Sequence, residues 1–81
     1  MQVEEKDLKK IFSRILKINI TKVNDSLSMN NNEKWDSFNH LKLILAIEGK
    51  FQISFDDEVV TQVISYKLLK LHLKKMKITF I

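Results

Sequence analysis

The residue best suited to chemistry in this chain is a serine that follows an aspartate at the start of an amphipathic stretch. The segment reads Trp35-Asp36-Ser37-Phe38. A hydroxyl at the beginning of a helix projects to where free backbone N–H groups and the helix dipole favour an anion. Ser37 is therefore a natural attachment point for a phosphate ester. The alternative is that Asp36 and Ser37 only cap the helix, as these residue types commonly do.

Other reactive groups are sparse. The chain has no cysteine, a single glycine and two histidines, His40 and His72. A thiolate metal site, a Cys nucleophile, a protein-borne thioester and a glycine-rich phosphate loop are therefore excluded. The two histidines fall on different predicted helices without further ligands, so each is better explained as a core or solvated side chain. We expect a protein that is not an enzyme and holds no metal. Any thiol that it uses must come from an attached group, because the chain has no cysteine.

The elements before Ser37 are a helix and a long loop. A helix is predicted over about residues 3 to 18, because its apolar residues recur at helical spacing. These residues are Leu8, Ile11, Phe12, Ile15 and Leu16. Residues 19 to 36 are rich in Asn, Asp and Ser, which compete with helix formation, and are predicted to be a loop. We expect its apolar members to pack over the helix ends. They are Val23, Leu27, Met29 and Trp35.

The run from Ser37 to Phe51 predicts a second helix with two apolar faces. At about 100° per residue, one face carries Leu43, Ile44, Ile47 and Phe51, and the other carries Phe38, Leu41 and Leu45. One face is enough for the core of a small protein, so the other is available to something that docks. A fully central helix would show the same pattern.

Two further helices complete the expected fold. The acidic cluster Asp56-Asp57-Glu58 suits the start of a short helix through about Val63, and Ser65 can cap a last helix flanked by lysines. The apolar tail, residues 78 to 81, has no predicted place. We expect one domain over residues 1–81, an all-α four-helix bundle with three long helices, a short third helix and a long loop after the first.

Charge and hydropathy exclude several classes of partner. The net charge is +4, and residues 64 to 81 hold five lysines and no acid. These lysines lack the interleaved aromatic residues of a base-stacking surface, so nucleic-acid binding is not expected. No stretch approaches the roughly 18 apolar residues of a membrane span, and no signal peptide is evident. We expect a cytoplasmic monomer, and the high Lys, Ile and Asn usage suggests a bacterial source.

The order of these elements resembles the acyl carrier protein family, including its peptidyl and aryl carrier relatives. Trp35-Asp36-Ser37-Phe38 corresponds to the family's Asp-Ser-Leu motif. The run from Leu43 to Glu48, followed by Phe51, Ile53 and Asp57-Glu58, follows the family's pattern through the second and third helices. The resemblance covers about residues 3 to 75.

The resemblance implies the chemistry of one residue. Ser37 should carry a 4′-phosphopantetheine group transferred from coenzyme A, whose thiol would hold acyl groups as thioesters. A phosphopantetheinyl transferase would install it, because a serine hydroxyl is a weak nucleophile. Asp36 would then position the transferase's metal or a basic partner residue, unless it is only a helix cap.

The resemblance also implies partners. Phe38, Leu41 and Leu45 would face acyl-activating, acyltransferase or ketosynthase-type enzymes of a fatty-acid, lipid or specialised-metabolite pathway, and Glu48 would meet their basic residues. The sequence departs from the family where Phe38 replaces Leu and where Trp35 replaces a common Gly. Asn39 and Lys42 occupy positions that are often acidic. A less negative docking face predicts partners with a less basic patch, in a specialised pathway.

Two alternatives remain open at this stage. The first is an unmodified protein-interaction module of the same fold, in which Ser37 only caps its helix. The second is a basic peripheral membrane-binding protein that uses the last helix and the apolar tail. The leucines at 68, 69, 71 and 73 are spread around that helix, which weakens the second alternative.

Overall fold

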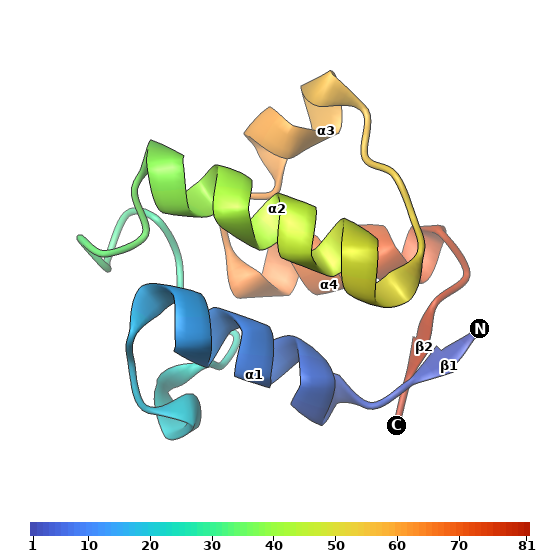
Figure 1. The fold of residues 1–81 in the computed structure, drawn as a ribbon, viewed down its shortest axis with the longest axis horizontal. Coiled ribbons are helices and arrows are strands. Elements are labelled where there is room, and N and C mark those ends of the chain that lie inside the picture. The colour runs from blue at the N-terminus through green and yellow to red at the C-terminus, as the bar shows by residue number, and fades with distance from the viewer.

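A computed structural model describes residues 1–81 as a bundle of four α-helices. Figure 1 shows their order along the chain. The helices are α1 (Glu5–Leu16), α2 (Ser37–Phe51), α3 (Asp57–Gln62) and α4 (Tyr66–Lys75). The predicted all-α fold with a short third helix and a long loop after the first is confirmed. No helix has both the length and the apolar character needed to cross a membrane.

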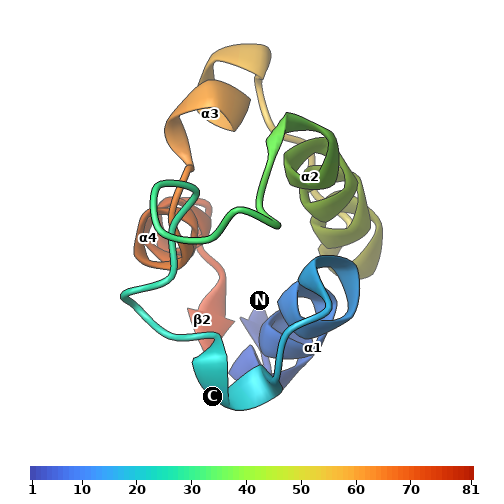
Figure 2. The same cartoon turned by 90° about the vertical axis from the view of Figure 1, so that its left-hand side faces the viewer.

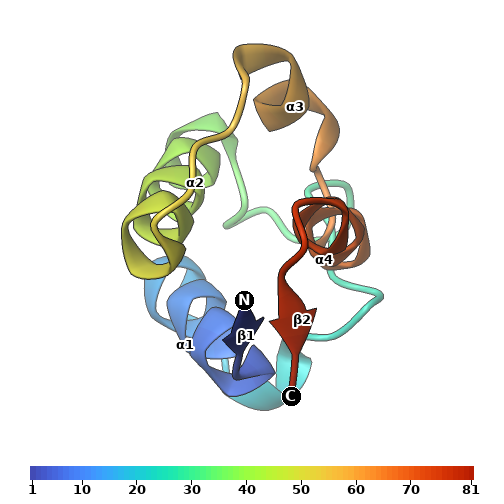
Figure 3. The ribbon, with the colours of Figure 1, turned by 90° about the vertical axis from the view of Figure 1, so that its right-hand side faces the viewer.

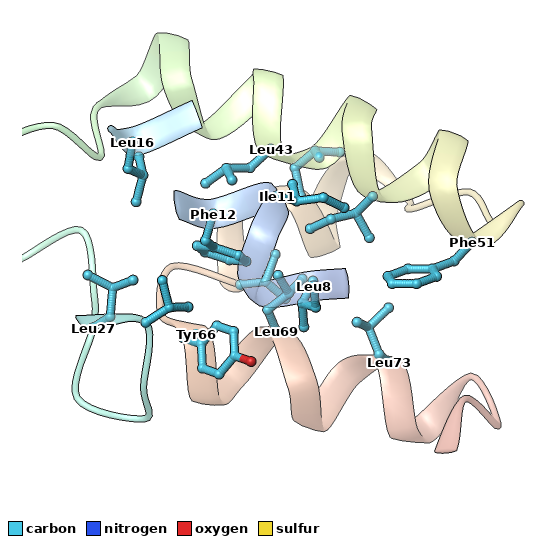
Figure 4. Close-up of a cluster of buried hydrophobic side chains, with 14 of the residues drawn as sticks. Leu8, Ile11, Phe12, Leu16, Leu27, Leu43, Phe51, Tyr66, Leu69 and Leu73 are labelled. Atoms are coloured by element: carbon cyan, nitrogen blue, oxygen red, sulfur yellow. The ribbon is translucent and has the colours of Figure 1, made fainter. Parts of the chain in front are cut away.

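The helices surround one hydrophobic core. Figures 2 and 3 show α1 and α2 side by side, with α4 on the opposite side of the molecule and α3 between α2 and α4. The apolar stripe of α1 faces inward, and Phe12 lies at its centre, edge-on to Trp35 and Tyr66 at centroid distances of 5.3 and 5.2 Å. Figure 4 shows side chains from α1, α2 and α4 meeting in this core.

The apolar residues of the long loop pack against the bundle, as expected from the sequence. Val23, Leu27 and Trp35 are buried and Met29 is half-buried. The backbone adds two hydrogen bonds that the sequence did not reveal. Tyr66 N donates to Leu27 O (2.9 Å), and Met29 N donates to Ile64 O (3.0 Å). The loop also contains a short 3-10 helix, Ile20–Lys22, which Asn19 caps.

The two ends of the chain pair with each other, and this was not predicted. Strand β1 (Gln2–Val3) lies parallel to β2 (Thr79–Phe80), with Gln2 opposite Thr79 and Val3 opposite Phe80. Ile78, just before β2, is buried in the core. The apolar tail is therefore part of the folded protein, and its neighbour is the N-terminal segment.

Some predicted helix boundaries were wrong by one or two residues. The first helix was expected over residues 3 to 18, but Val3 belongs to β1 and the helix ends at Leu16, because Lys17 adopts a left-handed conformation (φ 56°). The third helix begins at Asp57 and ends at Gln62, inside the predicted range from Asp56 to Val63. The pairing of β1 with β2 keeps Val3 out of the first helix, and the left-handed conformation of Lys17 ends that helix before residue 18. Both effects outweigh the local helical pattern.

Candidate functional site

Ser37 is the first residue of α2 and is exposed to solvent. The preceding residue, Asp36, is the N-cap: its carboxylate Oδ1 accepts a hydrogen bond from Asn39 N at 2.8 Å. Its carbonyl oxygen accepts the hydrogen bond from His40 N, also at 2.8 Å. Because Asp36 makes the capping bond, helix initiation does not require the Ser37 hydroxyl.

The backbone around Ser37 leaves donors available for an anion. The amides of Ser37 and Phe38 lie in the first turn of α2, where a helix provides no acceptor, and neither donates to another group of the protein. These N–H groups and the positive end of the helix dipole lie next to the Ser37 hydroxyl. The local field therefore favours a negatively charged substituent on this side chain.

A buried hydrogen-bonded chain supports the segment that leads into Ser37. Trp35 Nε1 donates to His40 Nδ1 at 2.9 Å, and His40 Nε2 lies 2.7 Å from Val60 O. Since Nδ1 accepts from the indole, the network assigns the ring proton to Nε2, which donates to the carbonyl. His40 is thus a core histidine that joins the loop, α2 and α3. No cluster of three or more His, Cys, Asp or Glu could hold a metal ion.

One of the two apolar faces of α2 is buried and the other is exposed to solvent. Leu43, Ile44, Ile47 and Phe51 are buried in the core. Phe38, Leu41 and Leu45 are 67%, 55% and 67% exposed. The structure therefore separates the interpretations that the sequence left open: α2 is not a fully central helix, and its outer face begins one residue after Ser37.

A groove lies between this outer face and α3. It encloses about 380 Å³ and its lining is mainly apolar. The lining residues are Leu41, Ile44, Leu45, Glu48, Phe55, Asp57 and Val60. A larger depression of about 610 Å³ lies over the Asn-rich loop, but it is open and mostly polar. The smaller groove is the better shelter for an apolar chain, because burial there removes more apolar surface from water.

Sequence reasoning missed two lining residues, Phe55 and Val60. Both lie outside the helical pattern of α2, and only the packing of α3 brings them to the groove. The one available signal was the aromatic residue in the short polar stretch before the acidic cluster. The position of Glu48 is also informative, because its Oε2 accepts a hydrogen bond from Phe55 N at 2.8 Å. Half-buried Glu48 therefore holds the α2–α3 connection in place.

The charges on the outer face are mixed. Lys42 Nζ lies 4.7 Å from the centroid of the Phe38 ring, a cation–π contact one helical turn along α2. The exposed acids near the groove are Asp56, Asp57 and Glu58, at the start of α3. The outer face of α2 thus carries a cation over Phe38, and its acidic neighbours come from α3.

Comparison with known proteins places this geometry in a family. No model of a known protein family matches the chain. Over 54 residues it is 41% identical to a protein named acyl carrier protein from Buchnera aphidicola subsp. Schizaphis graminum (strain Sg). The alignment covers 67% of this chain and 68% of that relative. With this identity over two-thirds of both sequences, and with the four-helix fold, the chain belongs to the acyl carrier protein family.

Proposed function

We propose that the protein works as an acyl carrier whose 4′-phosphopantetheine group is esterified to Ser37 Oγ. The observation that carries this proposal is the exposure of Ser37 at the first position of α2, with the capping role taken by Asp36. A hydroxyl that is exposed and not needed for capping can be modified without disturbing the helix. The family membership supports the same function.

The residues at this position fit the group. The amides of Ser37 and Phe38 and the dipole of the 15-residue helix α2 suit the negative charge of a phosphodiester. When attached, the group would supply the thiol that this cysteine-free chain lacks, and an acyl chain would be held on that thiol as a thioester. The protein's own contribution is to display the attachment point and to offer the α2–α3 groove to the acyl chain.

Attachment requires a separate enzyme. In this step the Ser37 Oγ–P bond forms, the bond between that phosphorus and the adenosine bisphosphate portion of coenzyme A breaks, and the serine proton passes to a base. The nearest histidine in the sequence, His40, is buried and has both ring nitrogens engaged. His40 is therefore unsuited to act as the base, and we assign the base and the metal to a phosphopantetheinyl transferase, as the family membership suggests.

The outer face of α2 is the proposed docking surface for that transferase and for acyl-transferring enzymes. Phe38, Leu41 and Leu45 supply exposed apolar area next to Ser37. Asp36 and Glu48 would meet basic partner residues, although both also make internal hydrogen bonds. Hydrophobic contact would supply affinity, and charge would govern encounter and partner choice.

Intact-mass spectrometry tests the modification directly. After co-expression with a promiscuous phosphopantetheinyl transferase, the wild-type chain should gain the mass of one phosphopantetheinyl group. Ser37→Ala should remain unmodified, whereas Ser54→Ala, a control at another exposed serine, should be modified like the wild type. A folded wild-type protein that gains no mass would instead support an unmodified interaction module of this fold.

A further inference from the structure

The inward side of α4 is fully occupied by the core. Tyr66, Leu69 and Leu73 are buried, and Figure 4 shows all three side chains directed toward α1 and α2. Lys70, at the edge of this side, forms ion pairs with Glu5 at 3.0 Å and Asp25 at 3.1 Å. These contacts determine which side of α4 faces outward.

The outward side combines leucines with unpaired lysines. Leu68 and Leu71 are 44% and 45% exposed. At about 100° per residue, the order around the helix is Lys74, Lys67, Leu71, Lys75 and Leu68, over an arc of roughly 120°. All three of these lysines are exposed, and none forms an ion pair within the protein. We call these five residues the basic face.

The chain segment that contains the basic face adds no negative charge to it. Lys77 is exposed just beyond the end of α4, and no acid occurs from residue 64 to residue 81. The basic face contains no arginine and no aromatic residue, the types that usually anchor protein–protein interfaces. Its lysines can lay their apolar stems beside the leucines while the ammonium groups reach outward.

We propose that the basic face binds the surface of a lipid bilayer that contains anionic lipids. Exposed leucines can enter the boundary between headgroups and acyl chains, and flanking lysines can contact the negatively charged headgroups. Neither interaction requires a spanning segment. The basic face is a peripheral contact, and its strength depends on anionic lipid content and on ionic strength.

This binding mode leaves the outer face of α2 free. Figures 2 and 3 place α4 across the molecule from α1 and α2. A bilayer against the outward side of α4 therefore does not cover the outer face of α2. The proposal does not depend on the modification of Ser37, but together the two would bring an acyl carrier to a membrane surface while its docking face stays accessible.

Vesicle co-sedimentation tests the proposal with the full-length wild-type chain. Large unilamellar vesicles of phosphatidylglycerol and phosphatidylcholine should bind the protein, and vesicles of phosphatidylcholine alone should bind it much less. Raising the salt concentration from 0.05 to about 0.5 M should weaken binding, because it shortens the screening length. No binding to the anionic vesicles at low salt would overturn the proposal.

Variants locate the contact. Each lysine near an anionic surface strengthens binding about five-fold, so the triple variant Lys67→Gln/Lys74→Gln/Lys75→Gln should bind roughly a hundred-fold more weakly. The matched control, Lys6→Gln/Lys10→Gln/Lys22→Gln, removes the same charge from exposed positions outside α4 and should bind far better than the α4 variant. Equal losses in the two variants would indicate a net-charge effect and would contradict a basic face on α4.

The leucines provide a second test. Leu68→Ser/Leu71→Ser should reduce binding even at low salt, while Ile20→Ser, at another exposed apolar position, should leave it unchanged. Circular dichroism establishes that each variant is folded. If the protein bound soluble polyglutamate through Lys67, Lys74 and Lys75 but did not bind anionic vesicles, the basic face would be assigned to an acidic protein partner and the membrane proposal would be wrong.

Discussion

At the scale of single residues, Trp35, Asp36 and Ser37 have different roles in the candidate site. Asp36 caps α2 with its side chain, so the Ser37 hydroxyl is not needed as a helix cap. Ser37 is exposed to solvent. Trp35, two residues before Ser37, is buried and anchored to His40. Ser37 thus lies between a buried aromatic side chain and the first turn of a helix, and its hydroxyl makes no hydrogen bond within the protein.

The Trp35–His40 pair gives a stability prediction. His40→Leu removes the acceptor of the buried indole N–H and the partner of Val60 O, and a buried polar group left unpaired costs about 1–3 kcal/mol. Urea unfolding should therefore show a loss of about 2–4 kcal/mol for the two groups together. The control His72→Gln, at a half-buried position with no such bond, should lose much less.

A double-mutant cycle with Trp35→Phe isolates the indole–imidazole bond. Trp35→Phe leaves Nδ1 without a donor, and the second substitution should then cost less than it does alone, by about 1 kcal/mol of coupling energy. Strictly additive losses would show that the two side chains do not depend on each other. Loss of the unique tryptophan requires circular dichroism as the probe in the variants that lack it.

At the scale of elements, α2 performs two tasks because its apolar residues form two arcs. The inner arc holds the core, and the outer arc, with Lys42 over Phe38, forms the proposed docking surface. The same principle applies to α4, where Leu69 and Leu73 face inward while Leu68 and Leu71 face outward. Each helix thus contributes one side to stability and presents the other to solvent.

The charge on the outer face of α2 predicts a change in partner preference. Lys42→Glu removes the cation over Phe38 and adds an acid to the outer face of α2, so encounter with a basic docking patch should become faster. We expect transfer to a set of transferases and synthases to change by about three- to ten-fold, upward for those with more basic patches. The measurement is kcat/KM for each enzyme at low salt.

The matched control for this experiment is Lys6→Glu. It makes the same charge change at an exposed position on α1, outside the proposed docking surface, and should leave the order of partner preference unaltered. If Lys42→Glu also left that order unaltered, Lys42 would have no part in partner choice.

At the scale of the whole molecule, a polar network joins the start of α1 to α4. Tyr66 Oη donates to Glu5 Oε2 at 2.8 Å, and Lys70 Nζ lies 3.0 Å from the same oxygen. Partial burial by itself raises the pKa of Glu5, but the hydrogen bonds from Tyr66 and Lys70 outweigh it and hold the pKa below its usual value. Burial and the bond to Glu5 raise the pKa of Tyr66.

These shifts predict how stability depends on pH. A carboxylate whose pKa is lower in the folded protein stabilises the fold above its unfolded pKa, about 4.3 for glutamate, and this contribution is lost as the pH falls through the folded pKa. Glu5→Gln should therefore cost about 1 kcal/mol near pH 7, a modest value because solvent screens the partly exposed pair. The cost should shrink toward pH 3.

Urea unfolding of wild type and variant at several pH values between 3 and 7 measures this difference. Glu4→Gln, a control at the neighbouring exposed position, should show no comparable dependence. A Glu5→Gln cost that stayed constant down to pH 3 would show that the ionised carboxylate is not the source of the stabilisation.

The sequence by itself determined the four helices to within about two residues, the N-caps of α2 and α4, and the place of Ser37. These features depend on residues within one or two turns of each other: apolar spacing predicts α1, and Asp36 and Ser65 predict the starts of α2 and α4, where both side chains accept the capping bonds. The start and end of α2 at Ser37 and Phe51 were predicted correctly. The all-α class follows from the same local signals.

Only the tertiary structure decided which segments meet. The pairing of Gln2–Val3 with Thr79–Phe80, the bond from His40 to Val60, and the inclusion of Phe55 in the groove all join residues that no local pattern relates. Tertiary contact also determined that Leu69 and Leu73 face the core while Leu68 and Leu71 face solvent. The physical reason is that helical periodicity specifies how side chains are arranged around one helix, whereas the rotation of that helix against its neighbours is set by the packing of the whole core.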